Sequence, residues 1–87
     1  MGAYRVRIKP SAVRELEAIE PRTLRRRIVA RITALADDPR PPGVEKLAGG
    51  GSRWRLRQGA YRILYEIDDA ERRLMIVRIG HRRDVYR

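Results

Sequence analysis

Apolar and polar residues alternate near the start of the chain, over residues 3–9. Tyr4, Val6 and Ile8 fall on one side of an extended backbone, and the residues between them are basic. Because successive side chains of a strand point to opposite faces, this pattern predicts a strand with one buried and one exposed face. Pro10 ends the strand, since proline has no N–H to donate to a strand ladder.

The spacing of apolar residues then lengthens to that of a helix. Residues 10–19 carry an apolar stripe at helical spacing, with Ser11 as the expected N-cap, and Pro21 ends this segment. A second and longer stripe runs over about residues 22–36, with arginines on the opposite face. We therefore predict two antiparallel helices that form a hairpin with one apolar side.

A loop rich in proline and glycine, residues 37–52, separates the helices from three further strands. These strands are predicted at residues 53–58, 61–67 and 73–80, and the last is almost continuously apolar, as expected of a central strand. Short turns join them, which predicts an antiparallel meander. The predicted fold class is α+β in two layers, with an N-terminal strand, a helix hairpin and a three-stranded antiparallel meander. This makes four strands in all, and the helices cover one face of the sheet.

The other face of the predicted sheet is strongly basic. Trp54 and Leu56 point toward the helices, as do Ile63 and Ile67 in the next strand, so the residues between them point to the open face. Glu66 is the only acid that these strands place there. Like charges on neighbouring strands repel, so we interpret this face as a phosphate-binding surface and not as ordinary surface charge. The alternation gathers seven cations on it: Arg5, Arg7, Lys9, Arg53, Arg55, Arg57 and Arg62.

The charge of the whole chain also favours a polyanionic partner. Its 87 residues include 21 Lys and Arg against 11 Asp and Glu, which gives a formal net charge of +10, and nearly all the cations are arginine. Arginine matches phosphate with two parallel hydrogen bonds, and every neutralised phosphate releases counterions. Nucleic acid or an acidic protein fits this charge better than a surface that is merely solvated.

Composition excludes several other classes of protein. The chain has no cysteine, so it has neither a disulfide framework nor a zinc knuckle, which suits a reducing compartment. It has no run of about 18 apolar residues and no signal-peptide pattern, so we expect a cytoplasmic protein without membrane contact. The acids at Asp37, Asp38, Asp68 and Asp69 are scattered in loops, so we predict no metal site and no cofactor.

The tail after the last strand contains the residues best suited to proton transfer. His81 is the only histidine, and Arg82, Arg83 and Tyr86 follow it at one rim of the predicted sheet. Histidine has an ordinary pKa near neutrality, and a phenol becomes a proton carrier where neighbouring cations lower its pKa. A lone histidine and a tyrosine near a chain end are also common packing residues, so both roles stay open at this point.

The segments WRLRQGAYRILYEI and IVRIGHRRDVYR, together with the first strand and the DDPRPPGVEKLAGG loop, resemble a known family. It is the RelE/ParE superfamily of bacterial toxin–antitoxin toxins, and within it the RelE-like mRNA interferases. The resemblance implies a single RelE-like toxin domain over residues 1–87 with a microbial ribonuclease-like fold. It also implies an acidic RelB-like antitoxin that wraps around the toxin in a hetero-oligomer, and cleavage of mRNA in the ribosomal A site.

The resemblance also points to individual residues. Arg53 and Arg55 stand where the best-known members have active-site lysines, and Arg62 matches the family's phosphate-binding arginine. Arg82 matches an arginine of the cleavage step, and Tyr86 matches a tyrosine of the same segment. The predicted site therefore has the catalytic residues Arg62, Arg82, Tyr86 and His81, and the RNA-binding residues Arg53, Arg55 and Arg57.

The reaction that this resemblance implies is metal-independent cleavage of RNA. The 2′-OH attacks the adjacent phosphate and the 5′-oxygen leaves, while arginines stabilise the growing negative charge. Tyr86 or His81 transfers the protons; His81 stands where some members carry lysine and others histidine, and base and acid stay unassigned between the two. Two alternatives remain open. One is a ParE-like toxin that binds DNA gyrase without nuclease activity, and the other is a non-catalytic RNA-binding module.

Overall fold

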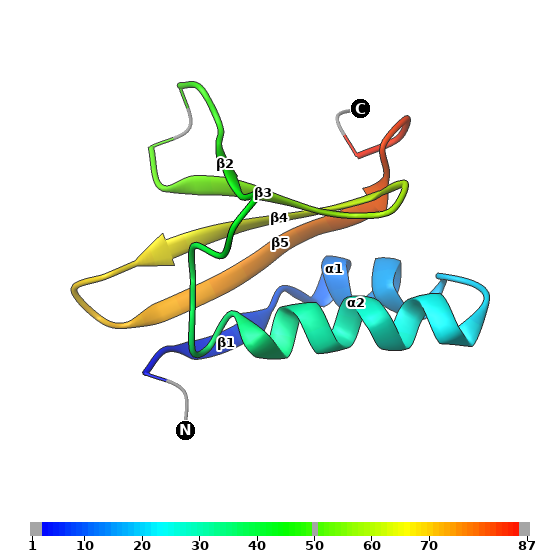
Figure 1. The fold of residues 1–87 in the computed structure, drawn as a ribbon, viewed down its shortest axis with the longest axis horizontal. Coiled ribbons are helices and arrows are strands. Elements are labelled where there is room, and N and C mark those ends of the chain that lie inside the picture. The colour runs from blue at the N-terminus through cyan, green and yellow to red at the C-terminus, as the bar shows by residue number, and fades with distance from the viewer. Residues whose placement is uncertain (1–2, 50, 86–87) are drawn as a thin grey trace.

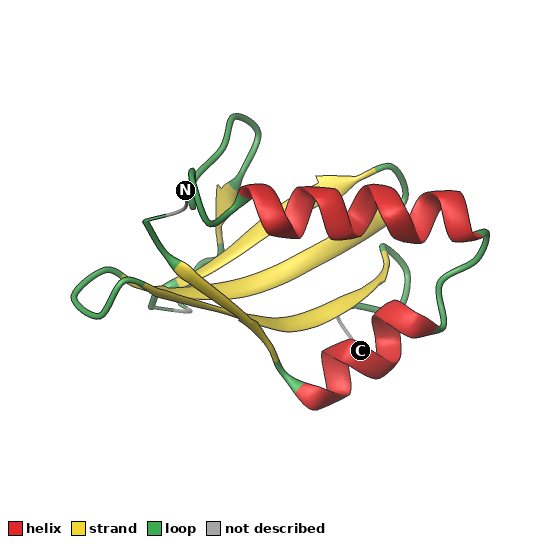
Figure 2. Ribbon diagram, turned by 90° about the horizontal axis from the view of Figure 1, so that it is seen from below, coloured by secondary structure: helices red, strands yellow, loops and turns green. Residues whose placement is uncertain are grey.

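Two helices cover one face of a five-stranded sheet in the computed structural model, which describes residues 3–49 and 51–85 (Figure 1). Seen from below, the helices run in opposite directions across that face (Figure 2). The predicted α+β class and the antiparallel meander are confirmed. Neither helix of the described chain combines the length and apolar character of a membrane span. The elements, in chain order, are β1 (Arg5–Ile8), α1 (Pro10–Glu17), α2 (Arg22–Ala34), β2 (Glu45–Lys46), β3 (Arg53–Gln58), β4 (Tyr61–Asp68) and β5 (Arg73–His81).

The sheet is mixed, because β1 and β5 are parallel while every other neighbouring pair is antiparallel. The strand order is β1-β5-β4-β3-β2. A parallel pair needs a long crossover connection, whereas tight turns are enough to join β3, β4 and β5. β5 lies between β1 and β4, as its apolar sequence predicts. The predicted number of four strands is wrong, because β2 forms within the loop that precedes β3.

The hydrophobic core lies between the helices and the sheet. Ile28 of α2 and the strand residues Leu56, Ile63 and Ile67 are at most 4% exposed. Trp54 packs against the same cluster from its edge. The four strand residues predicted to face the helices therefore do so. Complete burial of one such side chain contributes about 1.5–3 kcal/mol, and this burial fixes which face of β3 and β4 stays open.

The first helix begins at Pro10 and has no side-chain cap. Lys9 is its N-cap residue and makes no capping hydrogen bond. Proline suits the first helical position because its φ is already helical and no N–H is left without a partner. Ser11 consequently lies inside the first turn, so its prediction as N-cap is wrong. α2 ends at Ala34, close to the predicted end.

Helix α1 is attached to β5 through Glu15. The N–H of Ile79 donates to Glu15 Oε1 at 2.9 Å, and Arg78 Nε donates to Glu15 Oε2 at 3.3 Å. β1 ends at Ile8, opposite Ile76, so it does not reach this part of β5. The Glu15 carboxylate therefore takes the place of a strand partner for a backbone N–H that would otherwise lack one.

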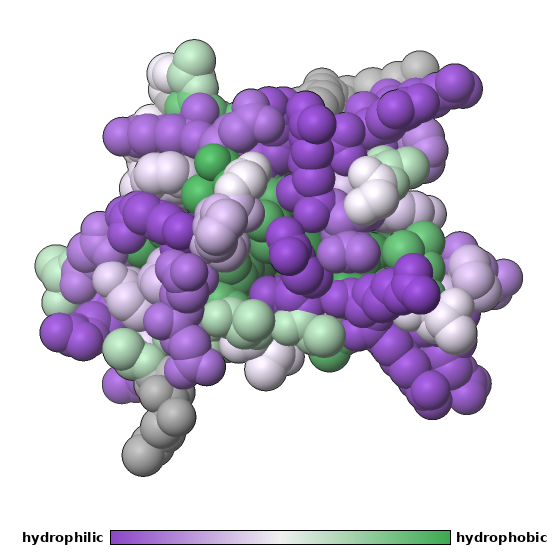
Figure 3. Space-filling model, in the orientation of Figure 1, coloured by the Kyte–Doolittle hydropathy of each residue, from purple (hydrophilic) through white to green (hydrophobic). Residues whose placement is uncertain are grey.

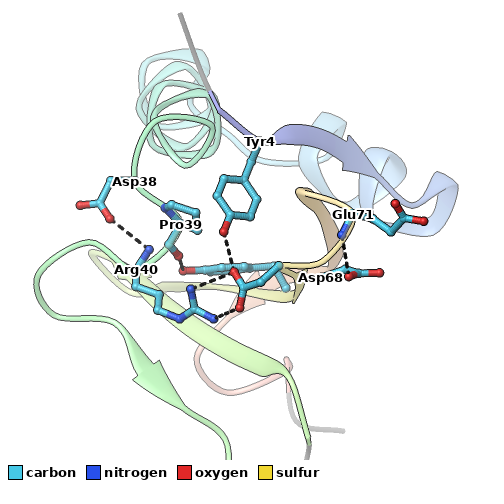
Figure 4. Close-up of polar contacts among 8 residues, drawn as sticks. Tyr4, Asp38, Pro39, Arg40, Asp68 and Glu71 are labelled. Atoms are coloured by element: carbon cyan, nitrogen blue, oxygen red, sulfur yellow. Dashed lines mark hydrogen bonds and ion pairs between the residues drawn. The ribbon is translucent and has the colours of Figure 1, made fainter.

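The segment between α2 and β2 is held by a cluster of polar contacts (Figure 4). Arg40 Nη2 lies 2.8 Å from Asp69 Oδ2, and the Tyr4 hydroxyl donates to Asp69 Oδ1. The hydrogen bond from Arg40 lowers the pKa of the Asp69 carboxyl, and the bond from Tyr4 lowers it further. The Arg40 guanidinium also lies 4.9 Å from the centre of the Trp54 ring. These contacts join the segment to β3, to the β4–β5 turn and to the N-terminal part of the chain.

A second contact anchors the same segment to the core. The Tyr65 hydroxyl donates to the carbonyl of Pro39 at 2.7 Å. Burial raises the pKa of Tyr65 to about 12, so this phenol stays protonated and remains a donor at neutral pH. Because β2 follows this segment, these anchors determine where β2 lies beside β3.

Candidate nucleic-acid interface

The face of the sheet that the helices leave uncovered, here called the open face, carries cations in register. At one end of the strands Arg57 pairs with Arg62, and Arg62 pairs with Gly80 of β5. At the other end Arg5 of β1 pairs with Arg73 of β5, which pairs with Asp68 of β4. The row that contains Arg57 and Arg62 and the row that contains Arg5 and Arg73 lie at opposite ends of β4, about 20 Å apart along the strand. The open face therefore has two basic ends.

Carboxylates lie beside all three predicted arginines of β3. Arg53 Nε lies 2.8 Å from Glu66 Oε2 on the neighbouring strand. Arg55 Nη2 lies 2.6 Å from Glu45 Oε2, and Arg57 Nη2 lies 3.7 Å from Glu45 Oε1. The predicted row of arginines is present on the open face, but internal ion pairs offset part of its charge.

Glu45 is the residue of this site that the sequence interpretation missed. It comes from β2 and pairs with Arg55 of β3, so Glu66 is not the only acid on the open face. The hydrogen bond from Arg55 lowers the pKa of the Glu45 carboxyl, and the positive charges of Arg57 and Arg62 lower it further. Glu45 is therefore ionised at neutral pH and serves as a counter-ion for the arginines around it.

Two predicted catalytic arginines meet at the turn between β3 and β4. Arg62 Nη1 donates to the carbonyls of Gly59 and Tyr61, at 3.1 and 3.0 Å. The backbone N–H of Arg82 donates to the carbonyl of Ala60 at 2.7 Å. Gly59 has a φ of +59°, a conformation that glycine adopts without strain. The chain segments of Arg62 and Arg82, which are far apart in the sequence, therefore meet at this turn, and we call this part of the open face the turn end.

The chain reaches the turn end because it folds back over the sheet after β5. A Cβ placed on Gly80 would lie 3.5 Å from the Cβ of Val85, which is an ordinary van der Waals distance, so the returning chain packs directly against β5 at this position. The N–H groups of Asp84 and Val85 both donate to the carbonyl of His81, at 2.8 and 3.0 Å, which closes the turn. Figure 1 shows this turn on the side of the sheet away from the helices.

A small apolar cluster lies on the open face beneath the returning chain. It consists of Leu64, Val77 and Val85, with Leu47 packed against it. A hollow of about 330 Å³ lies over this cluster, and Lys9, Arg53 and Arg78 contribute the cations of its lining. We call it the open-face hollow. It combines apolar side chains with positive charge, unlike the turn end.

His81 lies on the other side of the sheet from Arg62. Tyr65 pairs with Ile76 and Leu64 with Arg78, so Val77 is an extra residue in β5. A bulge of one residue reverses the alternation beyond it. His81 accordingly lies opposite Tyr61, with the ring centres 5.8 Å apart in an edge-to-face contact, and Tyr61 packs against the core on the helix side. His81 Nδ1 also accepts the N–H of Arg83 at 3.2 Å.

Two further predictions concern Tyr86 and metal binding. Tyr86 lies outside the described residues, so the structure does not place it relative to the arginines. No group of three histidines, cysteines or acids suited to holding a metal ion occurs within residues 3–49 and 51–85. The described site is therefore a cationic surface with Arg62 and Arg82 together at the turn end.

The sequence and the fold both match toxins. The model of the family described as "ParE toxin of type II toxin-antitoxin system, parDE" matches residues 6–86. Toxin RelG of Mycobacterium tuberculosis is 37% identical over 87 residues, which cover 97% of this chain and 97% of that protein. This chain belongs to the RelE/ParE family of type II toxins.

Solved complexes share the fold of this toxin. The archaeal RelE–RelB complex from Pyrococcus horikoshii matches with a TM-score of 0.81 at 29% identity, over 92% of this chain and 96% of that one. The RelBE2 toxin–antitoxin complex from Mycobacterium tuberculosis matches with a TM-score of 0.78 at 28% identity, over 91% and 98% of the two chains. Both were solved as toxin–antitoxin complexes, which supports the predicted antitoxin partner.

Proposed function

We propose that this toxin is a metal-independent endoribonuclease that cuts mRNA in the ribosomal A site. The observation that carries the proposal is the contact between the backbone of Arg82 and the β3–β4 turn, which lies beside the paired residues Arg57 and Arg62. β3, β4 and the C-terminal turn each contribute one arginine to this end of the sheet, and we propose that the three guanidinium groups bind one phosphate of the RNA. A gyrase-binding surface or a simple RNA-binding module would need the positive charge of this end of the sheet but no group that transfers protons, so the two interpretations differ in the role of Tyr86.

The proposed chemistry is attack of a 2′-OH on the adjacent phosphate with departure of the 5′-oxygen. Negative charge grows on the phosphate oxygens during this step, and fixed guanidinium groups stabilise it without gaining or losing protons. We assign this role to Arg62 and Arg82, and a supporting role to Arg55 on the open face. Glu45 has a lowered pKa and is a weak base, so we assign it the role of a counter-ion that the RNA phosphate displaces.

Proton transfer is assigned to Tyr86 in preference to His81. The His81 ring packs against Tyr61 on the helix side of the sheet, and its Nδ1 already accepts a backbone N–H. Tyr86 follows the Arg82 turn in the sequence, and a phenol becomes a proton carrier where guanidinium groups lower its pKa.

The proposed inhibitor is an acidic RelB-like antitoxin that covers the open face. The open-face hollow offers Leu64, Val77 and Val85 to apolar side chains, and the surrounding cations fit acidic ones. Electrostatic attraction of this kind accelerates association, and added salt slows it. Measuring the association rate of the two purified proteins against salt concentration tests this assignment. A rate that does not change with salt would contradict it.

The alternative function is binding of DNA gyrase, which the name of the matching family keeps open. One experiment separates the two. The purified toxin is incubated with translating ribosomes and the 5′ ends of the mRNA are mapped, while gyrase supercoiling is assayed in parallel. We expect new mRNA ends at A-site codons and unimpaired supercoiling. Inhibition of gyrase with intact mRNA would refute the nuclease and establish the alternative.

A further inference from the structure

Helix α2 carries a second concentration of arginines, on the layer that lies against the other face of the sheet. The chain has no acidic residue between Glu20 and Asp37, a stretch that contains the whole of α2. Figure 3 shows hydrophilic side chains projecting from the surface over the N-terminal end of this helix. The helix contains five arginines: Arg22, Arg25, Arg26, Arg27 and Arg31.

Within residues 3–49 and 51–85 these arginines have no carboxylate partner, unlike the arginines of the open face. Arg25 Nη1 donates to the carbonyl of Glu17 at 3.1 Å, and Arg31 Nη2 donates to the carbonyl of Arg57 at 3.4 Å. Arg22, Arg26 and Arg27 are exposed, and no other residue in the described part of the chain forms an ion pair or hydrogen bond with their side chains. We call these three residues the α2 arginine surface.

The placement of these charges works against the helix itself. Arg22 and Arg26 are one turn apart, where like charges repel. Arg22 also stands at the positive end of the helix dipole, and the first turn holds no acid to offset it. Neither effect is compensated within the described structure. An anionic partner would relieve both.

The composition of the surface indicates which anion binds there. Val29 is the only exposed large apolar residue of α2 in the described structure, and Ile28 and Ile32 are buried in the core. A membrane-binding helix needs a free apolar face, and a protein interface needs buried anchors at its centre. The α2 arginine surface has neither, but rigidly spaced guanidinium groups suit phosphates. Arg22 and Arg26 are about 6 Å apart along the helix axis.

We propose that the α2 arginine surface is a second RNA-binding surface, which holds the backbone of a base-paired RNA while the open face holds the strand to be cut. The role of the open face in holding the strand to be cut rests on the proposed function, whereas the binding of base-paired RNA depends only on the charges of α2. Base-paired RNA is bound mainly through its backbone and shape, for which an arginine surface without base-reading groups is suited.

The experiment compares two variants with equal loss of charge. The test variant is Arg22→Gln with Arg26→Gln and Arg27→Gln. The control variant is Arg5→Gln with Arg7→Gln and Arg73→Gln, at the end of the open face away from the turn end. The probe is an RNA duplex of about 16 base pairs, the span that double-stranded RNA-binding domains contact. Its dissociation constant is measured over a range of KCl concentrations, together with the cleavage of single-stranded mRNA.

We expect the test variant to bind the duplex at least tenfold more weakly than the control variant. The slope of log affinity against log salt should fall by about 0.7–0.9 for each phosphate that the variant no longer neutralises. The test variant should melt no lower than the parent, because repulsion within α2 is relieved. Equal duplex binding by the two variants would overturn the proposal, as would binding to vesicles of phosphatidylserine and phosphatidylcholine but not to the duplex.

The outcome is distinguishable from that of the proposed function. Arg62→Ala should reduce cleavage by about 100-fold and leave duplex binding unchanged. If the toxin cuts no RNA but the duplex still binds through α2, the α2 arginine surface is confirmed as an RNA-binding surface and the nuclease proposal is refuted. If cleavage is normal and the duplex does not bind, the proposal of a second RNA-binding surface is refuted and the nuclease proposal is unaffected.

Discussion

The open face and helix α2 are both rich in arginine, yet they differ in how the arginines are held. On the open face Glu66 and Glu45 pair with Arg53 and Arg55, and Arg62 is fixed by two carbonyls of its own turn. On α2, no carboxylate of the described chain pairs with Arg22, Arg26 or Arg27. Paired arginines have defined positions, whereas unpaired ones supply mainly positive potential.

This difference separates two roles of arginine. Arginines that are held in place can position a reacting phosphate, whereas arginines without partners mainly attract a polyanion. A reaction at one phosphate needs guanidinium groups placed to within a fraction of an ångström, which only a supported side chain achieves. Attraction of a polyanion needs only net charge, because counterion release is independent of exact geometry. Single substitutions should therefore matter on the open face, and only combined substitutions should matter on α2.

The largest effect is expected from the proton carrier. Tyr86→Phe keeps the ring and removes the hydroxyl, so RNA affinity and stability should barely change. Cleavage should fall by about 100-fold or more, the scale for the loss of one acid–base group. Single-turnover rates at saturating RNA measure this effect.

His81→Gln is the companion variant, since glutamine forms hydrogen bonds but does not titrate. Full cleavage by Tyr86→Phe, with loss of cleavage by His81→Gln, would transfer the role to the histidine. It would also require the ring of His81 to leave Tyr61 and reach the open face.

The next largest effect is expected from the counter-ion of the open face. Glu45→Gln frees Arg55 and Arg57 for phosphate, so RNA should bind more tightly, by no more than about fivefold given that exposed ion pairs are weak. Cleavage at saturating RNA should change little, because in the bound state the RNA phosphate has already displaced Glu45 from the arginines. Glu71→Gln is the control, since Glu71 Oε1 lies 3.8 Å from Arg73 Nη2 at the far end of the open face. Weaker RNA binding by Glu45→Gln would show that Glu45 is not a competitor of RNA.

A smaller effect, and one that depends on pH, is expected at the anchor of the segment before β2. Arg40 lowers the pKa of Asp69 in the folded state, so the Asp69 carboxylate stabilises the fold above its unfolded pKa of about 3.9. This contribution disappears as the pH falls through the lower, folded pKa. Asp69→Asn should therefore reduce the urea midpoint at pH 7 and leave it unchanged in strong acid. A difference that persists at every pH would mean that packing, not charge, is lost.

The smallest effect is expected from a single arginine of α2. Arg26→Gln should change cleavage of single-stranded RNA by less than twofold, because Arg26 contacts no residue of the site. Comparison of its cleavage rate with that of Arg57→Gln, on the open face, measures the contrast directly. A loss as large as that of Arg57→Gln would remove the distinction between the two surfaces.

The sequence predicted the faces of β3 and β4 well, for a physical reason. Trp54, Leu56, Ile63 and Ile67 recur at the strand period, and an error of one residue would bury a row of arginines. The free-energy cost of burying these arginines strongly specifies the register of the two strands, so an alternating pattern of this kind can be interpreted without tertiary information.

Glu45 and His81 could not be placed in that way. Glu45 belongs to a strand of two residues, which is too short to show a period, and the segment before it is held by long-range contacts of Arg40 and Tyr65. The position of His81 depends on the bulge at Val77, which reverses the alternation along a strand that is apolar on both faces. The meeting of Arg62 with Arg82 likewise depends on the fold-back over the sheet. Local pattern does not encode contacts of this kind.

The most direct test of the central claim compares one arginine at each end of the open face. Arg62→Ala and Arg5→Ala each remove one charge from the same surface, about 20 Å apart along the strands. The rate of mRNA cleavage at saturating substrate is measured for both. The account predicts a loss of about 100-fold for Arg62→Ala, the scale for removing one group that stabilises a developing charge, and no more than a small change for Arg5→Ala. Equal rates for the two variants would contradict the claim that cleavage takes place at the turn end.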